Sequence, residues 1–505
     1  MSSSSPVPAR AVPRERGTPR RGYGHRGIAL AIVLSAQLMV ILDATVVNIA
    51  LPHVQQSLHF SATSLSWVLN AYTLTFGGLL LLGGRAGDIL GRRRIFIAGI
   101  SLFTLASLAG GLATSAGLLL AARALQGVGG ALASPAVLAL IIGSFPEGRE
   151  RTRALSIYVG VVTGGSSLGL VLGGVITEWL SWRWVLFINV PIGILAVVVA
   201  PMFVAETPRQ PGRFDLTGAV TSTAGMALLV YAFIRAAASG WGDGLAVGAF
   251  AVAAVLLAVF LLNETRAPQP ITPLRLFADV SRSGSFVARL FLVAGMFGMF
   301  YFLTQFVQEV LGFSPLRAGI AFLPLTIMLF AVSRAAPRLM PVIGPKMLMI
   351  AGMVPVIIGM AWLSRVSPAT GYWTGVIGPM LLIGTGMGAV FVPLTTASLA
   401  GVRPEDSGAA SSMVNVMQQV GGSLGLAVLV AVFGTSVRNA GRHPLAGASP
   451  ALQAHRVLAH GISTAFLLAA ILDVVTLVVI IALIRARPQV PAPRPAEEQE
   501  EAVPA

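Results

Sequence analysis

The sequence contains no cysteine and a single lysine, Lys346, among its 505 residues. Without cysteine the chain can form no disulfide, hold no thiolate metal site and carry out no thiol catalysis. Charged residues are also scarce, at 10% of the chain, whereas 55% of the residues are hydrophobic and the mean hydropathy is +0.82. A soluble globule of this composition would be coated with apolar surface, so lipid is the natural solvent of the chain.

Acidic residues are outnumbered, with 19 Asp and Glu against 34 Lys and Arg. No Gly-Lys-Ser/Thr loop is present, so ATP is not the evident energy source. The six histidines are expected in loops or tails, where a metal site is not expected, and no cofactor is implied. No cluster of His, Asp or Glu marks one membrane face, which argues against a polytopic membrane enzyme. The histidines are His25, His53, His59, His443, His455 and His460.

Long apolar runs separated by short polar gaps dominate the chain, and about 20 apolar residues suffice to span a bilayer as a helix. The runs predict an all-α membrane protein with fourteen transmembrane helices. They lie at 28–51, 65–83, 95–113, 116–142, 154–176, 184–204, 216–235, 245–263, 285–308, 316–333, 346–364, 374–398, 411–434 and 462–484.

The basic residues predict the orientation of these spans, because cytoplasmic loops carry the excess of Lys and Arg. An even number of spans puts both termini on one side. That side holds 25 basic residues and the opposite side seven, while Arg123 and Arg289 fall inside spans. Both termini are therefore expected in the cytoplasm, and the net charge of +15 needs no nucleic acid to explain it.

The two ends of the chain are predicted to be disordered cytoplasmic tails, at 1–27 and 486–505. Arg20 and Arg21 precede an apolar stretch, as in a twin-arginine export signal. However, the stretch 28–51 is too long for a signal peptide, contains Asp43 and is followed by no small-residue cleavage site. It is interpreted as the first span.

Weak internal repeats suggest how the spans are grouped. GGSSLGL at 164–170 resembles GGSLGL at 421–426, and GRAG at 84–87 resembles SRAA at 333–336. Both pairs lie eight spans apart, so two six-helix bundles with a two-helix insert between them are predicted, with the substrate site between the bundles. The expected boundaries are 28–205, 206–283 and 284–485.

Two charged residues lie deep inside spans at matching depth. Asp43 is about eight residues, or ~12 Å, from the outer end of its span, and Arg123 is about seven residues, or ~10 Å, from the outer end of its own. A carboxylate at this depth is costly and is by default functional, with a partner facing a cavity. Arg123 cannot lose its proton, so it could hold Asp43 charged when near and free it to bind a proton when apart. Purely structural roles for either residue remain alternatives.

Other residues in the spans are weaker candidates. Gly165, Gly169 and Gly173, with Gly174, form a smooth ridge that another backbone can approach closely. Asp473 is either a second acidic site or a structural or lipid-facing, protonated carboxyl group, and Arg289 is expected to snorkel. Polar residues expected to contact substrate in the cavity are Gln37, Asn48, Asn70, Tyr72, Gln126, Tyr301, Gln305 and Asn415.

Five ordered motifs carry a family resemblance. They are LDATVVNIALP at 42–52, GRAGDILGRRR at 84–94, RALQGVGG at 123–130, WRWVLFINVPIG at 182–193 and LGFSPLRAG at 311–319. Together they resemble the fourteen-helix drug:proton antiporters of the major facilitator superfamily. The resemblance implies a 6 + 2 + 6 arrangement and a bacterial cytoplasmic membrane protein that is monomeric. It also implies alternating access that exchanges protons for amphipathic drugs or antibiotics, and it assigns proton coupling to Asp43.

The resemblance also implies a cytoplasmic latch. Asp88 and the neighbouring Arg85 and Arg92 would make contacts between helices, while Gly84, Gly87 and Gly91 would allow a tight turn. One motif departs from the family, because the fifth span reads GLVLGG at 169–174 where a Gly-Pro kink is usual. This departure leaves a proton-coupled uptake symporter on the same fold as the alternative.

Overall fold

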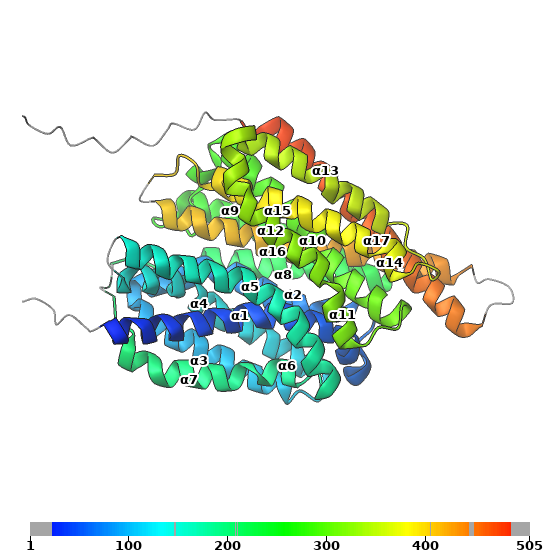
Figure 1. Ribbon diagram of the computed structural model, residues 1–505, viewed down its shortest axis with the longest axis horizontal. Coiled ribbons are helices and arrows are strands. Elements are labelled where there is room, and N and C mark those ends of the chain that lie inside the picture. The colour runs from blue at the N-terminus through cyan, green and yellow to red at the C-terminus, as the bar shows by residue number, and fades with distance from the viewer. Residues whose placement is uncertain are drawn as a thin grey trace, which may run out of the picture.

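The computed structural model describes residues 23–485 except 146–147, 208, 210, 404–405 and 444–448, and every regular element in these residues is a helix (Figure 1). The predicted tails at 1–27 and 486–505 lie outside the described residues apart from 23–27, which are helical because the first helix begins at Tyr23.

The helices follow the predicted spans in order. The first group is α1 (Tyr23–Leu58), the 3-10 turn η1 (Ser64–Ser66), α2 (Trp67–Leu90), α3 (Arg92–Gly111), α4 (Ala116–Ser144), α5 (Arg149–Trp179), α6 (Trp184–Phe187) and α7 (Asn189–Phe203). Two helices follow, α8 (Leu216–Ser239) and α9 (Gly244–Arg266). The last group is the 3-10 turn η2 (Leu274–Phe277), α10 (Val280–Gln305), the π-helical turn η3 (Phe306–Val310), α11 (Pro315–Ala321), α12 (Leu323–Ile343), α13 (Pro345–Leu363), α14 (Tyr372–Gly375), α15 (Ile377–Leu399), α16 (Ser407–Gly441) and α17 (Pro450–Leu483).

Among the described residues, thirteen helices are long and apolar enough to cross a membrane. Counted as one span, α5 is the fourteenth, and it bends by 42° between Ser166 and Leu168. The bend occurs beside Gly164 and Gly165. Small residues let a helix bend here without a proline, which this span lacks. The fold is that of a fourteen-span, all-α membrane protein, as predicted.

Several helices extend beyond the apolar runs. His25 and His53 lie in α1, and His455 and His460 lie in α17, so the expectation that all histidines occupy loops or tails was wrong for these four. A helix need not stop at the membrane surface, because capping groups can end it in water. The side chain of Ser449, for example, accepts a hydrogen bond from the backbone of Leu452 at the start of α17.

The start of α1 and the end of α17 lie at the same end of the helix bundle, on the left in Figure 1. We call this the terminal end and the opposite one the far end. At the far end, Gln308 donates a hydrogen bond of 2.9 Å to the carbonyl of Ile49, and the backbone of Leu316 donates one of 2.8 Å to Glu178. These contacts join the helices before α8 to those after α9.

The buried hydrophobic side chains also differ between the two ends of the bundle. A large cluster of buried side chains runs from Leu42 to Leu58 of α1 into α10, α13, α15 and α17. The terminal half of α1, from Ala29 to Val40, packs instead in a separate cluster confined almost wholly to helices α1–α7. The two groups of helices therefore share a large cluster toward the far end, and α2 also packs against a cluster from α16 and α10 nearer the terminal end.

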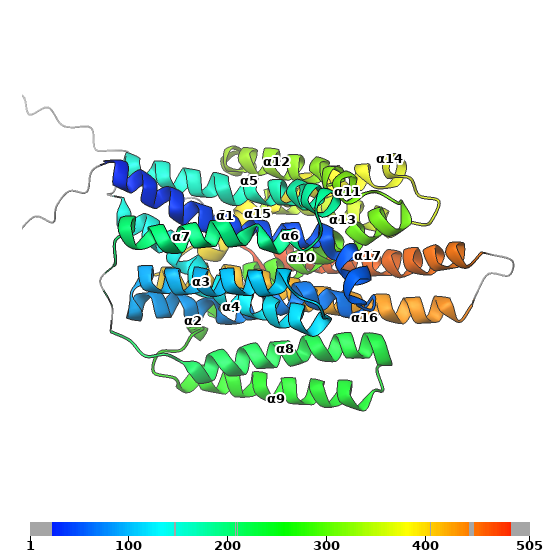
Figure 2. The same ribbon diagram turned by 90° about the horizontal axis from the view of Figure 1, so that it is seen from below.

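Helices α8 and α9 form a pair along one flank of the bundle (Figure 2). Within the pair, α8 contacts both α2 and α16, and its Val230 and Ile234 pack with Leu74 and Ala427. The outer helix α9 is largely exposed on the surface of the protein, as expected for a helix that faces lipid.

Candidate functional site: a buried ion pair between α1 and α4

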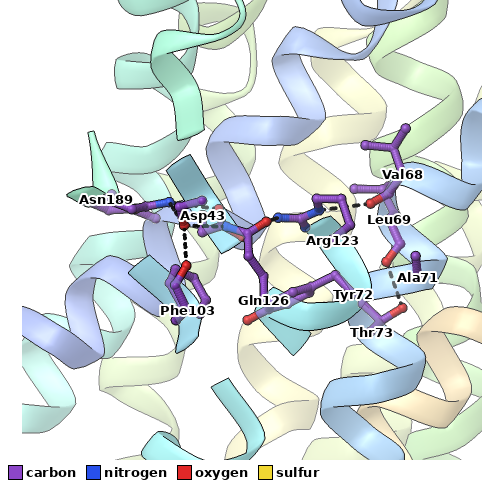
Figure 3. Close-up of polar contacts among 12 residues, drawn as sticks. Asp43, Val68, Leu69, Ala71, Tyr72, Thr73, Phe103, Arg123, Gln126 and Asn189 are labelled. Atoms are coloured by element: carbon purple, nitrogen blue, oxygen red, sulfur yellow. Dashed lines mark hydrogen bonds and ion pairs between the residues drawn. The ribbon is translucent and has the colours of Figure 1, made fainter. Parts of the chain in front are cut away.

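The two deep charges predicted from the sequence meet in the structure. Arg123 Nη1 in α4 lies 2.5 Å from Asp43 Oδ2 in α1, and neither side chain is exposed (Figure 3). Each residue is carried by a helix in which no other charged residue lies at this depth. Each charge is thus the counter-ion that the other needs in a site without water.

Two amide side chains complete the shell around Asp43. Its Oδ1 accepts hydrogen bonds from Gln126 Nε2 at 3.0 Å and from Asn189 Nδ2 at 2.9 Å. Both amides also reach Ser107 Oγ, at 2.7 Å from Gln126 and 3.4 Å from Asn189. Asp43 therefore faces donors from α4 and α7, an arrangement suited to an ionised carboxylate, which accepts hydrogen bonds and donates none.

Arg123 is held by helix α2 as well. Its Nε donates a hydrogen bond of 3.0 Å to the carbonyl of Val68, and its guanidinium group lies 4.5 Å from the ring centre of Tyr72. Its Nη1 also donates to Gln126 Oε1 at 2.9 Å. The third nitrogen, Nη2, is buried without a hydrogen-bond partner. Arg123 thus links the proton-binding candidate on α1 to the backbone of α2.

A narrow cavity reaches Arg123 from the far end. Its volume is about 10 Å³, close to what one water molecule needs. Its other lining residues are all apolar and come from α1, α2, α4 and the segment around α6: Val47, Ala50, Val54, Val68, Leu119, Trp182, Val185 and Leu186. Arg123 is the charged residue in the lining of this cavity.

The polar residues predicted to line a cavity are only partly brought together. Tyr72 and Gln126 belong to the shell of the ion pair. Tyr301 donates to the carbonyl of Ala62 at 3.3 Å, across to the other group of helices, and Asn415 is exposed on α16. The remaining four, Gln37, Asn48, Asn70 and Gln305, are buried, and both polar side-chain atoms of Asn70 lack a partner.

Comparison with known sequences identifies the family. The profile described as Major Facilitator Superfamily matches residues 33–426. The chain belongs to the major facilitator superfamily. This membership makes it a multi-pass membrane transporter of small molecules rather than an enzyme.

Several facilitators of known name are similar over most of their length. The puromycin resistance protein pur8 of Streptomyces alboniger is 44% identical over 84% of this chain and 84% of its own. The cephamycin export protein CmcT of Amycolatopsis lactamdurans is 42% identical, over 81% of this chain and 85% of its own. A solved structure of a bacterial homologue of the lysosomal transporter Spinster, inward-facing and occupied, aligns with a TM-score of 0.67 at 17% identity, covering 92% and 98% of the two chains. That likeness shows the facilitator fold.

The glycine ridge of this facilitator lies against two helices. A Cβ atom built at Gly165 or Gly169 would meet side chains of α1, and one at Gly173 would lie 2.8 Å from the carbonyl oxygen of Val46. At Gly174 the neighbour is different: a Cβ atom there would lie 2.6 Å from the carbonyl oxygen of Pro315, in α11. Gly174 is thus at a contact between the two groups of helices.

The residues of the predicted latch lie at the junction of α2 and α3. Asp88 Oδ1 accepts hydrogen bonds from Arg92 Nε at 3.1 Å and Nη2 at 3.0 Å, and Arg85 donates to Gln269 after α9. Gly91 has a φ of 109°, a conformation open to glycine, and makes the turn. Gly84 and Gly87 lie inside α2 and make no turn, so this part of the prediction was wrong.

Two charged residues of the later helices differ from expectation. Arg289 does not snorkel: it is 3% exposed and lies between α10, α15 and α16. Asp473 is fully buried in α17 beside Gly295 of α10, and both of its carboxyl oxygens lack a hydrogen-bond partner. It therefore does not face lipid.

Sequence reasoning missed Asn189 and Ser107, which hold the ion pair. Asn189 stands within the WRWVLFINVPIG motif, and an amide in so apolar a stretch was an available signal. Ser107 offered none, because a serine in a membrane helix commonly bonds its own backbone, as Ser107 also does to Phe103.

Proposed function

We propose that this facilitator is a proton-coupled antiporter that exports antibiotics or similar amphipathic small molecules across the bacterial cytoplasmic membrane. The observation that carries the proposal is the buried Asp43–Arg123 pair, a carboxylate whose charge is balanced by one fixed cation. Relatives named for puromycin resistance and cephamycin export support the direction of transport and the class of substrate.

The terminal end is placed in the cytoplasm, because the basic residues are concentrated in the loops of that end. The helices 28–205 and 284–485 form two bundles, and the segment 206–283 is an insert whose α8 covers the seam between α2 and α16. Each chain acts as a monomer, because both bundles and the ion pair belong to one chain.

The transport cycle alternates between two closures. In the conformation described here, η3 and α11 contact α1 and α5 at the far end, and we infer that substrate enters from the cytoplasm. When the far end opens, a proton from outside reaches Asp43 past Arg123. Protonation neutralises the Asp43 carboxylate that pairs with Arg123. The hydrogen bonds that Gln126 and Asn189 donate to this carboxylate then loosen. The altered packing of α1 against α4 then favours release of the substrate outside and return of the transporter to the conformation closed at the far end.

Everted membrane vesicles provide the test. Vesicles with an acidic interior should take up puromycin or a cephamycin in proportion to the amount of this protein, and dissipating the pH gradient should stop uptake. In whole cells, the protein should lower the accumulated drug. Accumulation above that of control cells would instead indicate a symporter.

Replacing Arg123 with lysine is expected to lower proton-driven flux by about tenfold. This factor corresponds roughly to the free energy of one lost charge-assisted hydrogen bond. Lysine keeps the charge but lacks the planar fork with which arginine reaches Val68, Gln126 and Asp43 together. Flux in proteoliposomes, measured across a range of pH, checks this. A normal pH profile with normal flux would contradict the role of Arg123 in coupling.

Replacing Asp88 with alanine is expected to reduce transport several-fold without loss of protein from the membrane. Asp88 holds Arg92 at the cytoplasmic junction of α2 and α3, and closing that end requires this junction to be ordered. Arg94→Ala is the control at the same junction, because Arg94 is 63% exposed and its removal takes away a positive charge and a long ion pair of 3.9 Å with Glu206. Equal transport by the Asp88 variant and the parent would refute the latch.

A further inference from the structure

Arg289 is a buried cation without a counter-ion in the described part of the chain. It lies in α10 and is 3% exposed. Its Nη2 donates a hydrogen bond of 2.5 Å to Thr395 Oγ1 in α15, and its Nη1 donates one of 3.4 Å to Gln418 Oε1 in α16. Its Nε is buried and has no hydrogen-bond partner. Both of its side-chain partners are neutral.

The helices that carry Arg289 and its hydrogen-bond partners do not supply the missing charge. The sequences of α10, α15 and α16 contain no aspartate or glutamate. Arg289 therefore contrasts with Arg123, which is equally buried but is paired with Asp43. Because arginine stays protonated in proteins, Arg289 cannot escape the cost of its burial by losing the charge.

The neighbours of Arg289 form a mixed surface. Phe391 and Thr395 of α15 and Gln418 of α16 are each half-buried, and Arg289 lies 5.7 Å from the ring centre of Phe391. One turn before Gln418, the side chain of Asn415 is exposed. A ligand arriving at this surface would meet an aromatic face, neutral hydrogen-bonding groups and, just beneath them, a positive charge.

We propose that Arg289, with Thr395 and Gln418, forms a subsite that binds the carboxylate or an equivalent anionic group of an amphipathic substrate. The anion supplies the counter-charge that the helices lack, and Phe391 contacts the apolar part of the same molecule. This subsite rests on the proposed export function, of which it specifies the substrate class. It makes Arg289 a residue that determines specificity rather than a structural tie.

The test compares two fluorescent probes with the same apolar body and opposite charge, pyrenebutyrate and pyrenebutylamine. Each is titrated into the full-length protein in nanodiscs, with empty nanodiscs subtracted. Arg289→Gln should weaken binding of pyrenebutyrate by at least about tenfold, because a buried charge partner is lost, and should leave pyrenebutylamine within about twofold. Arg289→Lys, which keeps the charge, should retain most of the affinity for the anion.

Arg282→Gln is the matched control, because Arg282 is another buried arginine of α10 that bonds a backbone carbonyl and lies outside the subsite. It should change anion binding much less than Arg289→Gln does. Thermal unfolding of each variant checks that the helices remain packed. Equal weakening of both probes by Arg289→Gln, or no loss of pyrenebutyrate binding, would overturn the subsite.

The binding test is independent of transport. If the parent protein binds pyrenebutyrate through Arg289 but a pH gradient drives neither probe across proteoliposomes, the subsite stands and the antiport function fails. If a pH gradient drives both probes equally well in the parent and in Arg289→Gln, antiport stands and the subsite fails.

Discussion

Replacing Asp43 with asparagine is expected to abolish substrate movement driven by a pH gradient. Asparagine has nearly the shape of aspartate but cannot bind and release a proton at physiological pH. The step by which proton entry changes the packing of α1 against α4 is therefore lost. Exchange of substrate across the membrane without a gradient should persist, because it needs alternating access but no net proton transfer. Drug uptake into everted vesicles and counterflow in proteoliposomes measure the two activities separately.

The variant also changes stability, which must be separated from coupling. With Asp43 neutral, Arg123 stays buried without a counter-ion, and breaking a buried pair in this way costs about 3–5 kcal/mol. The double variant Asp43→Asn with Arg123→Gln removes both charges and should recover much of that stability. It should still lack proton-driven transport, so a loss of coupling in a well-folded protein assigns the function to the pair.

Asp473 supplies a control for the general effect of a membrane carboxyl group. It is as buried as Asp43 but has no hydrogen-bond partner and no cation beside it in the described residues. Asp473→Asn should therefore keep proton-driven transport close to that of the parent. If Asp43→Asn retained full coupling while Asp473→Asn lost it, the proton site would belong to α17.

The number of spans could be predicted from the sequence because lipid demands about 20 apolar residues for each crossing. The ends of the helices could not be predicted, because outside the lipid both helical and irregular backbone can form hydrogen bonds with water. Hence α17 begins at Pro450, well before its apolar run at 462–484. The turn between α2 and α3 shows the same limit: three glycines were candidates, and only Gly91 adopts a positive φ.

The ion pair could be predicted because depth along a span follows directly from residue number, and Asp43 and Arg123 share a depth. The rotation of each helix about its axis was harder to predict, because a span that is apolar on all sides has no face set by hydropathy. Asn189 turns toward Asp43, and Arg289 turns toward α15 and α16, for packing reasons that the pattern does not contain. The sequence therefore located the pair and missed part of its shell.

Replacing Gly174 with alanine is expected to shift this facilitator toward a conformation open at the far end and to slow transport strongly. A Cβ atom there would lie 2.6 Å from the carbonyl oxygen of Pro315 and 2.8 Å from Cα of Leu316, both backbone atoms that cannot rotate away. Overpacking of this kind costs about 1–3 kcal/mol. That cost falls on the closed far end alone, because Pro315 and Gly174 separate when the far end opens.

Gly160→Ala is the matched control within the same helix, because Gly160 lies away from the bend of α5 and a Cβ atom there would have no neighbour within 4 Å. Both changes raise helix propensity equally, so a difference between them reports the contact of α5 with α11. The chain contains no cysteine, so Gln308→Cys introduces a unique thiol at a side chain that is 9% exposed and bonded across to α1. A membrane-impermeant maleimide added outside should label it faster in the Gly174 variant than in the Gly160 variant. Equal labelling would mean that this glycine contact does not control closure of the far end.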